Sequence, residues 1–102
     1  MHDVYILYSR SFDKYYTGET VDVLIRLEQH NSSFYGKSST SYIKDWELVL
    51  RLVVENRSEA LKVERYIKSM KSKAFIRKLV GDEGYLANFK AIVEKKFQIR
   101  IH

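Results

Sequence analysis

Residues 3–18 read DVYILYSRSFDKYYTG. Residues 4–8 are β-branched, aliphatic or aromatic, a composition typical of a strand. Serines and Asp13 follow, as in a turn, and residues 14–18 again favour a strand. The stretch therefore predicts a β-hairpin.

The chain beyond the hairpin continues this α+β pattern. Thr20 or Asp22 can cap a helix that ends near residues 30–31. A polar, loop-like segment at residues 32–41 precedes a third strand, predicted at residues 46–54. Strict alternation would place one set of side chains on a single face of that strand: Trp46, Leu48, Leu50, Leu52 and Val54.

The second half of the chain has helical spacing. Ser58 is expected to cap a helix, and a break near Ser72 separates it from a third helix that ends at about Val80, before Gly81. The apolar face of the first of these helices consists of Ala60, Val63, Ile67 and Met70.

A C-terminal extension at residues 81–102 is expected to pack on the domain formed by residues 1–80. It contains an apolar helical pattern, made by Tyr85, Leu86, Phe89, Ile92 and Val93. Alternation of Phe97, Ile99 and Ile101 then predicts a short strand.

Composition limits the class of protein. The 102 residues, 45% of them hydrophobic, suit one domain with a modest core. The absence of cysteine excludes disulfides and cysteine-based metal sites, and three histidines make a zinc site a poor expectation. No apolar run approaches the roughly 20 residues of a membrane span, and no signal pattern opens the sequence, so we expect a soluble, cytoplasmic protein without a membrane partner.

Positive charge is concentrated between residues 59 and 80. This stretch has seven basic and two acidic side chains, so it carries the whole formal net charge of +5. A local basic surface is typical of a protein that binds phosphates, although a solvated helix face would have the same pattern.

Three groups of residues could carry chemistry. Tyr5 and Tyr16, on adjacent hairpin strands, could bind a phosphate oxygen or a water, or could simply pack together. Arg26 and His30, one helical turn apart, could stabilise phosphate charge and relay a proton, or could be ordinary surface and helix-end residues. Glu64 borders the apolar face of its helix and therefore needs a partner, either a lysine or a metal ion.

Together these residues resemble the GIY-YIG nuclease family. Residues 4–7 (VYIL) match the first signature strand, with Tyr5 at the signature tyrosine and Val4 in place of its glycine. Residues 15–18 (YYTG) match the second, and Tyr16 begins the triplet there.

Two helical blocks extend the resemblance to about Val80. Residues 20–31 resemble the helix that carries the arginine of the family, which maps to Arg26. Residues 59–68 resemble the glutamate helix, which makes Glu64 the metal ligand and Lys68 its accompanying lysine. The pattern is most similar to the small standalone bacterial members related to the N-terminal domain of the repair nuclease UvrC.

The resemblance implies a three-stranded antiparallel sheet flanked by helices, with an active site on the sheet surface. It implies an endonuclease that uses Mg²⁺ or Mn²⁺, and a role in repair on selected DNA structures. Tyr5 would activate or orient water, Tyr16 and His30 would position the water or the phosphate, and Arg26 would stabilise charge. Four basic residues would hold the nucleic-acid backbone: Lys68, Lys71, Lys73 and Arg77.

Two other functions stay open at this level. A non-catalytic nucleic-acid-binding module could share the fold, and an aromatic sheet surface could stack single-stranded RNA. The sequence decides neither between DNA and RNA nor the oligomeric state, and a protein partner could supply specificity.

Overall fold

The structure is a computed structural model that describes residues 1–32 and 42–102. Its centre is an antiparallel sheet of three strands, β1 (His2–Ser9), β2 (Lys14–Thr20) and β3 (Trp46–Val54), in the order β2-β1-β3. The predicted three-stranded antiparallel sheet and the α+β class are confirmed. β2 is an edge strand, joined to β1 by the predicted hairpin.

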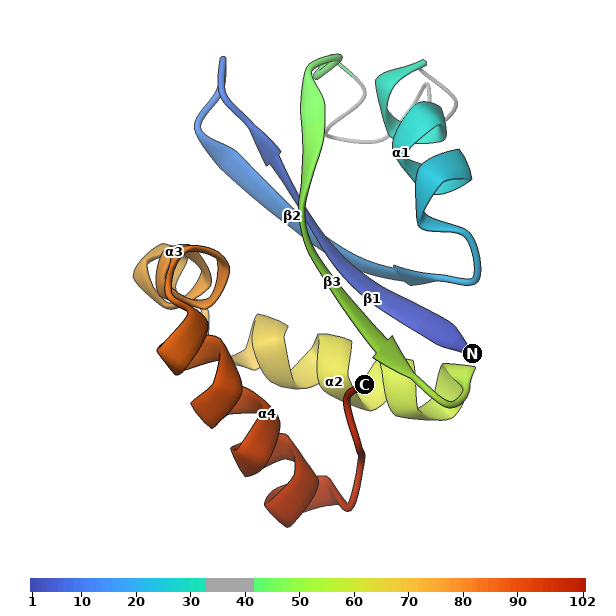
Figure 1. The fold of residues 1–102 in the computed structure, drawn as a ribbon. Helices are drawn as coiled ribbons and strands as arrows, with labels where there is room; N and C mark the ends of the chain where they lie inside the picture. Colours follow the sequence, from blue (N-terminus) through green and yellow to red (C-terminus); the bar gives the residue numbers. More distant parts are fainter. Residues whose placement is uncertain (33–41) are drawn as a thin grey trace.

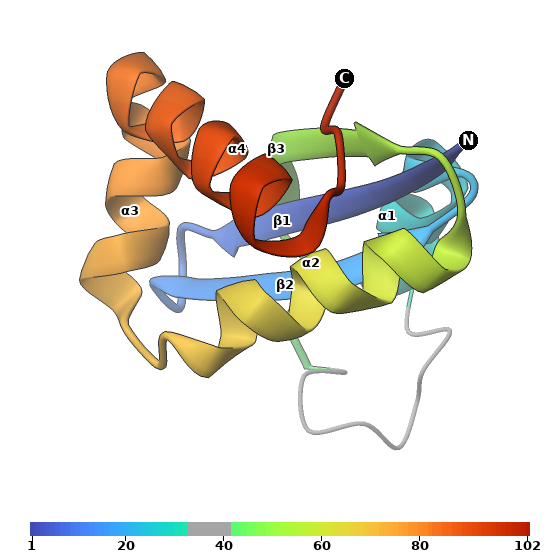
Figure 2. The ribbon, with the colours of Figure 1, turned by 90° about the horizontal axis from the view of Figure 1, so that it is seen from below.

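Helices cover both faces of the sheet (Figure 1). In the described part of the chain they are α1 (Val23–Asn31), α2 (Arg57–Ser69), α3 (Lys73–Gly81) and α4 (Glu83–Phe97). α1 lies on one face, and the other three helices lie on the opposite face. Figure 2 shows α2 running beside β2, the strand that it contacts most.

Alternate side chains of β1 enter two separate hydrophobic cores. Val4 and Ile6 pack with α2, whereas Tyr5 and Leu7 pack with Val23 of α1. The four β1 side chains are at most 2% exposed. A strand that is buried on both faces needs apolar residues at successive positions, which explains the unbroken run at the start of the chain.

The strict alternation predicted for β3 is wrong at the centre of the strand. Leu48 pairs with Leu7, but Leu50 pairs with Ile6, so Val49 is the extra residue of a β-bulge. One extra residue moves every later side chain to the other face. The first part of β3 therefore packs in the core under α1, and the later part packs in the core under α2.

Each of α1, α2 and α3 begins after a capping residue, but the cap predicted for α2 is wrong. Asp22, one of the two caps expected, caps α1, and Ser72, where the sequence predicted only a break between helices, caps α3. The cap of α2 is Asn56, not Ser58, so α2 begins two residues earlier than expected. Asparagine is as good a cap as serine, and Ser58 already lies in the first helical turn.

Two apolar side chains predicted to face the core are exposed. Met70 is the C-cap of α2, beyond its last buried turn, and is 37% exposed. Ile92 on α4 is 41% exposed, because the buried face of α4 is formed by Phe89 and Val93, one helical turn apart.

The short C-terminal strand is not formed. Gln98 adopts a left-handed backbone conformation with φ 56° and turns the chain back after α4. A backbone hydrogen bond from the N–H of His102 to the carbonyl of Val53 joins this segment to β3 at 2.9 Å. Ile99 is nevertheless buried in the core under α2, so its apolar character reflects packing and not pairing.

The expected loop at residues 32–41 lies, from residue 33 onward, outside the described residues. Within residues 1–32 and 42–102, no helix has the length and apolar character needed to cross a membrane.

The packing of α4 gives a direct test of the fold. Phe89→Ala should lower the free energy of unfolding by about 3 kcal/mol, because a ring that is 3% exposed leaves a cavity when it is removed. Ile92→Ala, on the exposed side of the same helix, should cost less than about 1 kcal/mol. Urea unfolding followed by circular dichroism measures both, and equal losses would contradict this orientation of α4.

Candidate active site

Tyr5 and Tyr16 lie side by side on the sheet face that α1 covers. Tyr5 pairs with Gly18 and Tyr16 with Leu7, which places the two phenols at diagonal positions on adjacent strands. Their ring centroids are 6.3 Å apart, with a 27° angle between the ring planes. Tyr5 is 2% exposed, whereas Tyr16 is half-buried, so only Tyr16 has substantial access to solvent.

Gly18 lets the Tyr5 ring lie against the backbone of β2. A Cβ at Gly18 would stand 2.5 Å from the Tyr5 hydroxyl oxygen and 2.7 Å from its Cζ. It would also stand 3.1 Å from the ring of Tyr16. Any side chain at this position would displace the phenols, so Gly18 is a positioning residue, a role that the sequence did not predict.

His30 joins the two tyrosines from α1. Its Nε2 is 3.1 Å from the Tyr5 hydroxyl, and its ring centroid is 4.6 Å from that of Tyr16. Burial lowers the pKa of His30 below its ordinary value of 6.5, and the positive charge of Arg26 lowers it further. A neutral His30, protonated on Nδ1, can accept a hydrogen bond from the Tyr5 hydroxyl through Nε2.

Arg26 is half-buried on α1, one turn before His30. Its charge acts on His30, so the predicted neighbours do share one environment. A guanidinium close enough to act on His30 favours the neutral form of the imidazole, and its fork is suited to bind an anion.

Asn31 fixes the end of α1 on β3. Its amide donates to the carbonyl of Trp46 at 2.9 Å and accepts from the N–H of Trp46 at 2.7 Å. The indole of Trp46 in turn lies 6.2 Å from Tyr16 and 6.3 Å from His30, between ring centroids. Asn31 therefore holds His30 in place, a role that the sequence indicated only through its position at the end of the helix.

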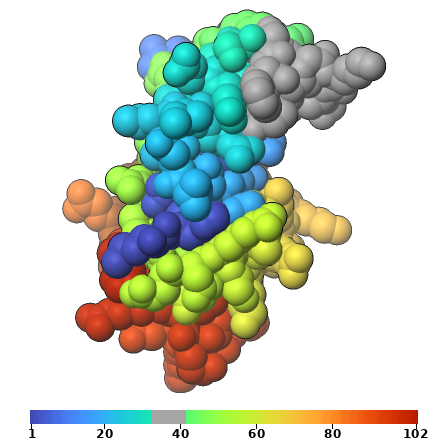
Figure 3. Space-filling view, turned by 90° about the vertical axis from the view of Figure 1, so that its right-hand side faces the viewer, coloured from blue at the N-terminus to red at the C-terminus, as the bar shows by residue number. Residues whose placement is uncertain are grey.

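Glu64 lies on α2, the helix that packs beside the edge strand β2. Lys68 links it to the phenols, since its Nζ is 3.3 Å from Oε2 of Glu64 and 6.0 Å from the ring centroid of Tyr16. Glu64 and Lys68 therefore form an ion pair, which is the lysine alternative of the two partners expected for Glu64. Its side chains are 15% and 53% exposed, and solvent screening leaves such a pair weak enough to be broken by a ligand. Figure 3 shows α1 and α2 on one face of the molecule, with the N-terminal strands between them.

The residues at this edge fit a magnesium-type ion better than a zinc-type one. Among residues 1–32 and 42–102, no group of three or more histidine and acidic side chains could hold a metal. Mg²⁺ keeps several waters and is often held by one or two carboxylates together with substrate phosphates. Glu64, bonded to Lys68 through one of its two oxygens, can supply such a carboxylate.

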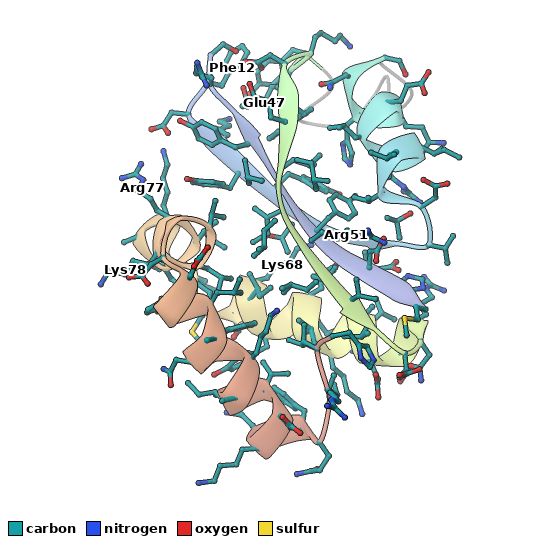
Figure 4. The ribbon with its side chains drawn as sticks, in the orientation of Figure 1. Phe12, Glu47, Arg51, Lys68, Arg77 and Lys78 are labelled. Atoms are coloured by element: carbon teal, nitrogen blue, oxygen red, sulfur yellow. The ribbon has the colours of Figure 1, made fainter. Side chains whose placement is uncertain are left out.

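The four predicted backbone-binding residues are exposed along the end of α2 and along α3: Lys68, Lys71, Lys73 and Arg77. Two of them also hold α3 to the hairpin turn. Lys73 Nζ is 2.6 Å from Oδ2 of Asp13, and a nitrogen of Arg77 is 3.8 Å from Oδ1. The hydrogen bond from Lys73 lowers the pKa of Asp13, which keeps this carboxylate charged. Figure 4 shows Lys68 and Arg77 among the side chains.

The contact at Gly18 predicts a large effect from one methyl group. Gly18→Ala should lower the free energy of unfolding by about 1–3 kcal/mol, because the Tyr5 ring must move. Gly81→Ala is the matched control, since no heavy atom lies within 4 Å of its added Cβ and alanine favours a helix. Urea unfolding compares the two. A Gly18→Ala variant as stable as the wild type would show that Tyr5 does not lie against β2.

The lowered pKa of His30 predicts a loss of stability in acid. Below pH 6.5 the unfolded chain protonates this histidine more readily than the folded chain, so stability falls as the pH is lowered through that value. The urea midpoint should fall between about pH 7.5 and about pH 5, and it should fall less in His30→Gln. If His30→Gln keeps the wild-type pH dependence, His30 does not carry the effect.

The family model of the GIY-YIG catalytic domain matches residues 1–78, from β1 into α3. Neither a curated protein nor a solved structure matches the chain. The matched segment contains every candidate site residue, from Tyr5 to Arg77. Since the match covers more than half of the chain, this protein belongs to the GIY-YIG family, a nuclease superfamily.

Proposed function

We propose that this chain is a metal-dependent endonuclease that hydrolyses phosphodiester bonds in DNA. The observation that carries the proposal is the set of contacts around Tyr16. Its ring meets Tyr5 on β1, His30 on α1 and Lys68 on α2. A proton acceptor, a half-exposed phenol, a cation and the Glu64 carboxylate therefore gather at one edge of the sheet.

Glu64 would hold the divalent ion, Mg²⁺ or Mn²⁺. When bound there, the ion would supply Lewis-acid stabilisation for the charge on the departing 3′ oxygen. Lys68 bonds one of the two carboxylate oxygens of Glu64, Oε2, and 53% of the Lys68 side chain is exposed. It can therefore leave the carboxylate and turn toward a phosphate, and its positive charge would then help to bind the substrate.

Tyr5 and His30 would orient the attacking water and accept its proton. The buried hydroxyl of Tyr5 would orient that water or act as its general base, and the neutral imidazole 3.1 Å away can accept the phenol proton. Tyr16, half-exposed, would position the water or the phosphate. Arg26 would stabilise the negative charge that builds on the phosphate.

Residues 1–80 would form the nuclease unit, and residues 81–102 would complete its packing. Lys71, Lys73 and Arg77 would hold the flanking DNA backbone together with Lys68. Such contacts are independent of sequence and weaken with salt. We expect the nuclease to act in repair on selected DNA structures, as UvrC-related nucleases do. A cytoplasmic location stays a prediction.

Glu64→Gln should reduce cleavage at least about a hundredfold, because the neutral amide is a poor ligand for a hard divalent ion. Its affinity for DNA should stay nearly unchanged, since the lysines remain. Nicking of supercoiled plasmid and of branched DNA, with Mg²⁺ or Mn²⁺ and with EDTA, measures the first effect. Fluorescence anisotropy in EDTA measures the second.

Glu94→Gln removes an exposed carboxylate from α4 and should cleave like the wild type. Cleavage retained by Glu64→Gln would contradict the metal-ligand assignment. Tight DNA binding without cleavage by the wild type, on every DNA and with either metal, would favour a non-catalytic binding module instead.

A further inference from the structure

A groove of about 700 Å³ extends from the candidate site to the tip of the hairpin. It lies between the β1–β2 hairpin and the corner where α2 meets α3. Tyr16 and Lys68 line it at the end that borders the candidate site, and Phe12 lines it at the hairpin tip. Figure 4 shows Phe12 at that tip, with Arg77 on the neighbouring part of α3. The groove therefore starts where cleavage is proposed and leads away from it.

The groove is lined by positive charge. Its described lining includes four lysines, Lys14, Lys68, Lys71 and Lys73, and a single acid, Asp13. Asp13 is already engaged, because it receives hydrogen bonds from Tyr8 at 2.7 Å and from Lys73 at 2.6 Å. Lys73 is paired with Asp13 and Lys68 with Glu64, so the positive charge that remains in the groove comes from Lys14 and Lys71, and it attracts a polyanion.

At the far end of the groove, Phe12 packs against a second exposed aromatic residue, Tyr42, which lies next to the described lining. Phe12 is 47% exposed and Tyr42 is 49% exposed, with ring centroids 4.9 Å apart in an edge-to-face arrangement. Lys14 donates to the Tyr42 hydroxyl at 2.9 Å and lies 5.6 Å from the centroid of its ring. Two half-exposed rings beside an ammonium group are the components of a surface that stacks an unpaired base.

We propose that this groove binds an unpaired DNA strand next to the scissile phosphate, with bases stacked on Phe12 and Tyr42 and phosphates on Lys14 and Lys71. The proposal rests on the nuclease function above and specifies its substrate as a junction of duplex and single strand. A base within a duplex has both faces covered by its neighbours, so only an unpaired base can use the rings. Phe12 lies in the hairpin turn, four positions before Tyr16 on β2, so the two residues are at most about 13 Å apart along the chain, a length that holds a few nucleotides.

The test is binding in EDTA, which is independent of whether the wild type cleaves. Two labelled DNAs with equal numbers of phosphates are compared by anisotropy: a blunt duplex, and a duplex with a single-stranded arm that carries 2-aminopurine next to the junction. We expect the junction to bind about tenfold more tightly than the duplex, as stacking of one or two bases would give. We also expect the 2-aminopurine fluorescence to be quenched on binding.

The double variant Phe12→Leu with Tyr42→Leu keeps apolar bulk but removes the aromatic faces. It should lose the preference for the junction and the quenching, and it should bind the duplex like the wild type. Ile92→Ala, which removes a comparably exposed apolar side chain on α4, should keep both. An unfolding midpoint shows that each variant is folded.

Three results would overturn the proposal: equal affinity of the wild type for both DNAs, a junction preference that survives in the double variant, or an equal loss of affinity for both DNAs in that variant. None of these requires cleavage. A wild type that shows the stacking but never cleaves DNA would contradict the proposed nuclease function alone.

Discussion

The approach of the Tyr5 ring to the backbone of Gly18 is the contact on which the candidate site depends. Because no Cβ occupies the space at Gly18, the buried phenol can lie against β2 and meet His30. The same arrangement leaves room for the ring of Tyr16 beside it. Tyr5, Tyr16 and His30 therefore come together only when β1 pairs with β2 in this register and α1 packs on this face of the sheet.

The site also depends on a sheet that supports two cores. β1 contributes side chains to both, and the bulge at Val49 lets β3 do the same. The core on one face holds α1 with His30, and the core on the other holds α2 with Glu64. These helices reach the same place only because β2 is a free edge, around which Lys68 can extend to Tyr16. Loss of packing on either face should therefore disturb the geometry of the site.

Much of this architecture is predictable from local sequence, since hairpin strands, capping residues and helical spacing depend on neighbouring positions. The bulge is not, because Trp46, Leu48 and Leu50 alternate perfectly and only pairing with β1 shows that they divide between faces. Candidate residues follow from chemistry and from the resemblance. The contacts that hold these candidate residues in place cannot be predicted in the same way, because they join positions distant in the chain. Asn31 bonds to Trp46, and Lys73 bonds to Asp13, 60 residues away. Separations of this kind leave no periodic signal in a single sequence.

One divalent ion is proposed to bind at Glu64, near the phenols that α1 and the hairpin bring together. The most direct measurement is a titration of Mn²⁺ into isotope-labelled protein, followed by NMR, because the paramagnetic ion broadens nearby resonances in a distance-dependent way. The signals of Glu64, Lys68 and Tyr16 should broaden first, and Glu64→Gln should abolish this broadening. Broadening centred elsewhere, or broadening at the same residues that persists in Glu64→Gln, would contradict it.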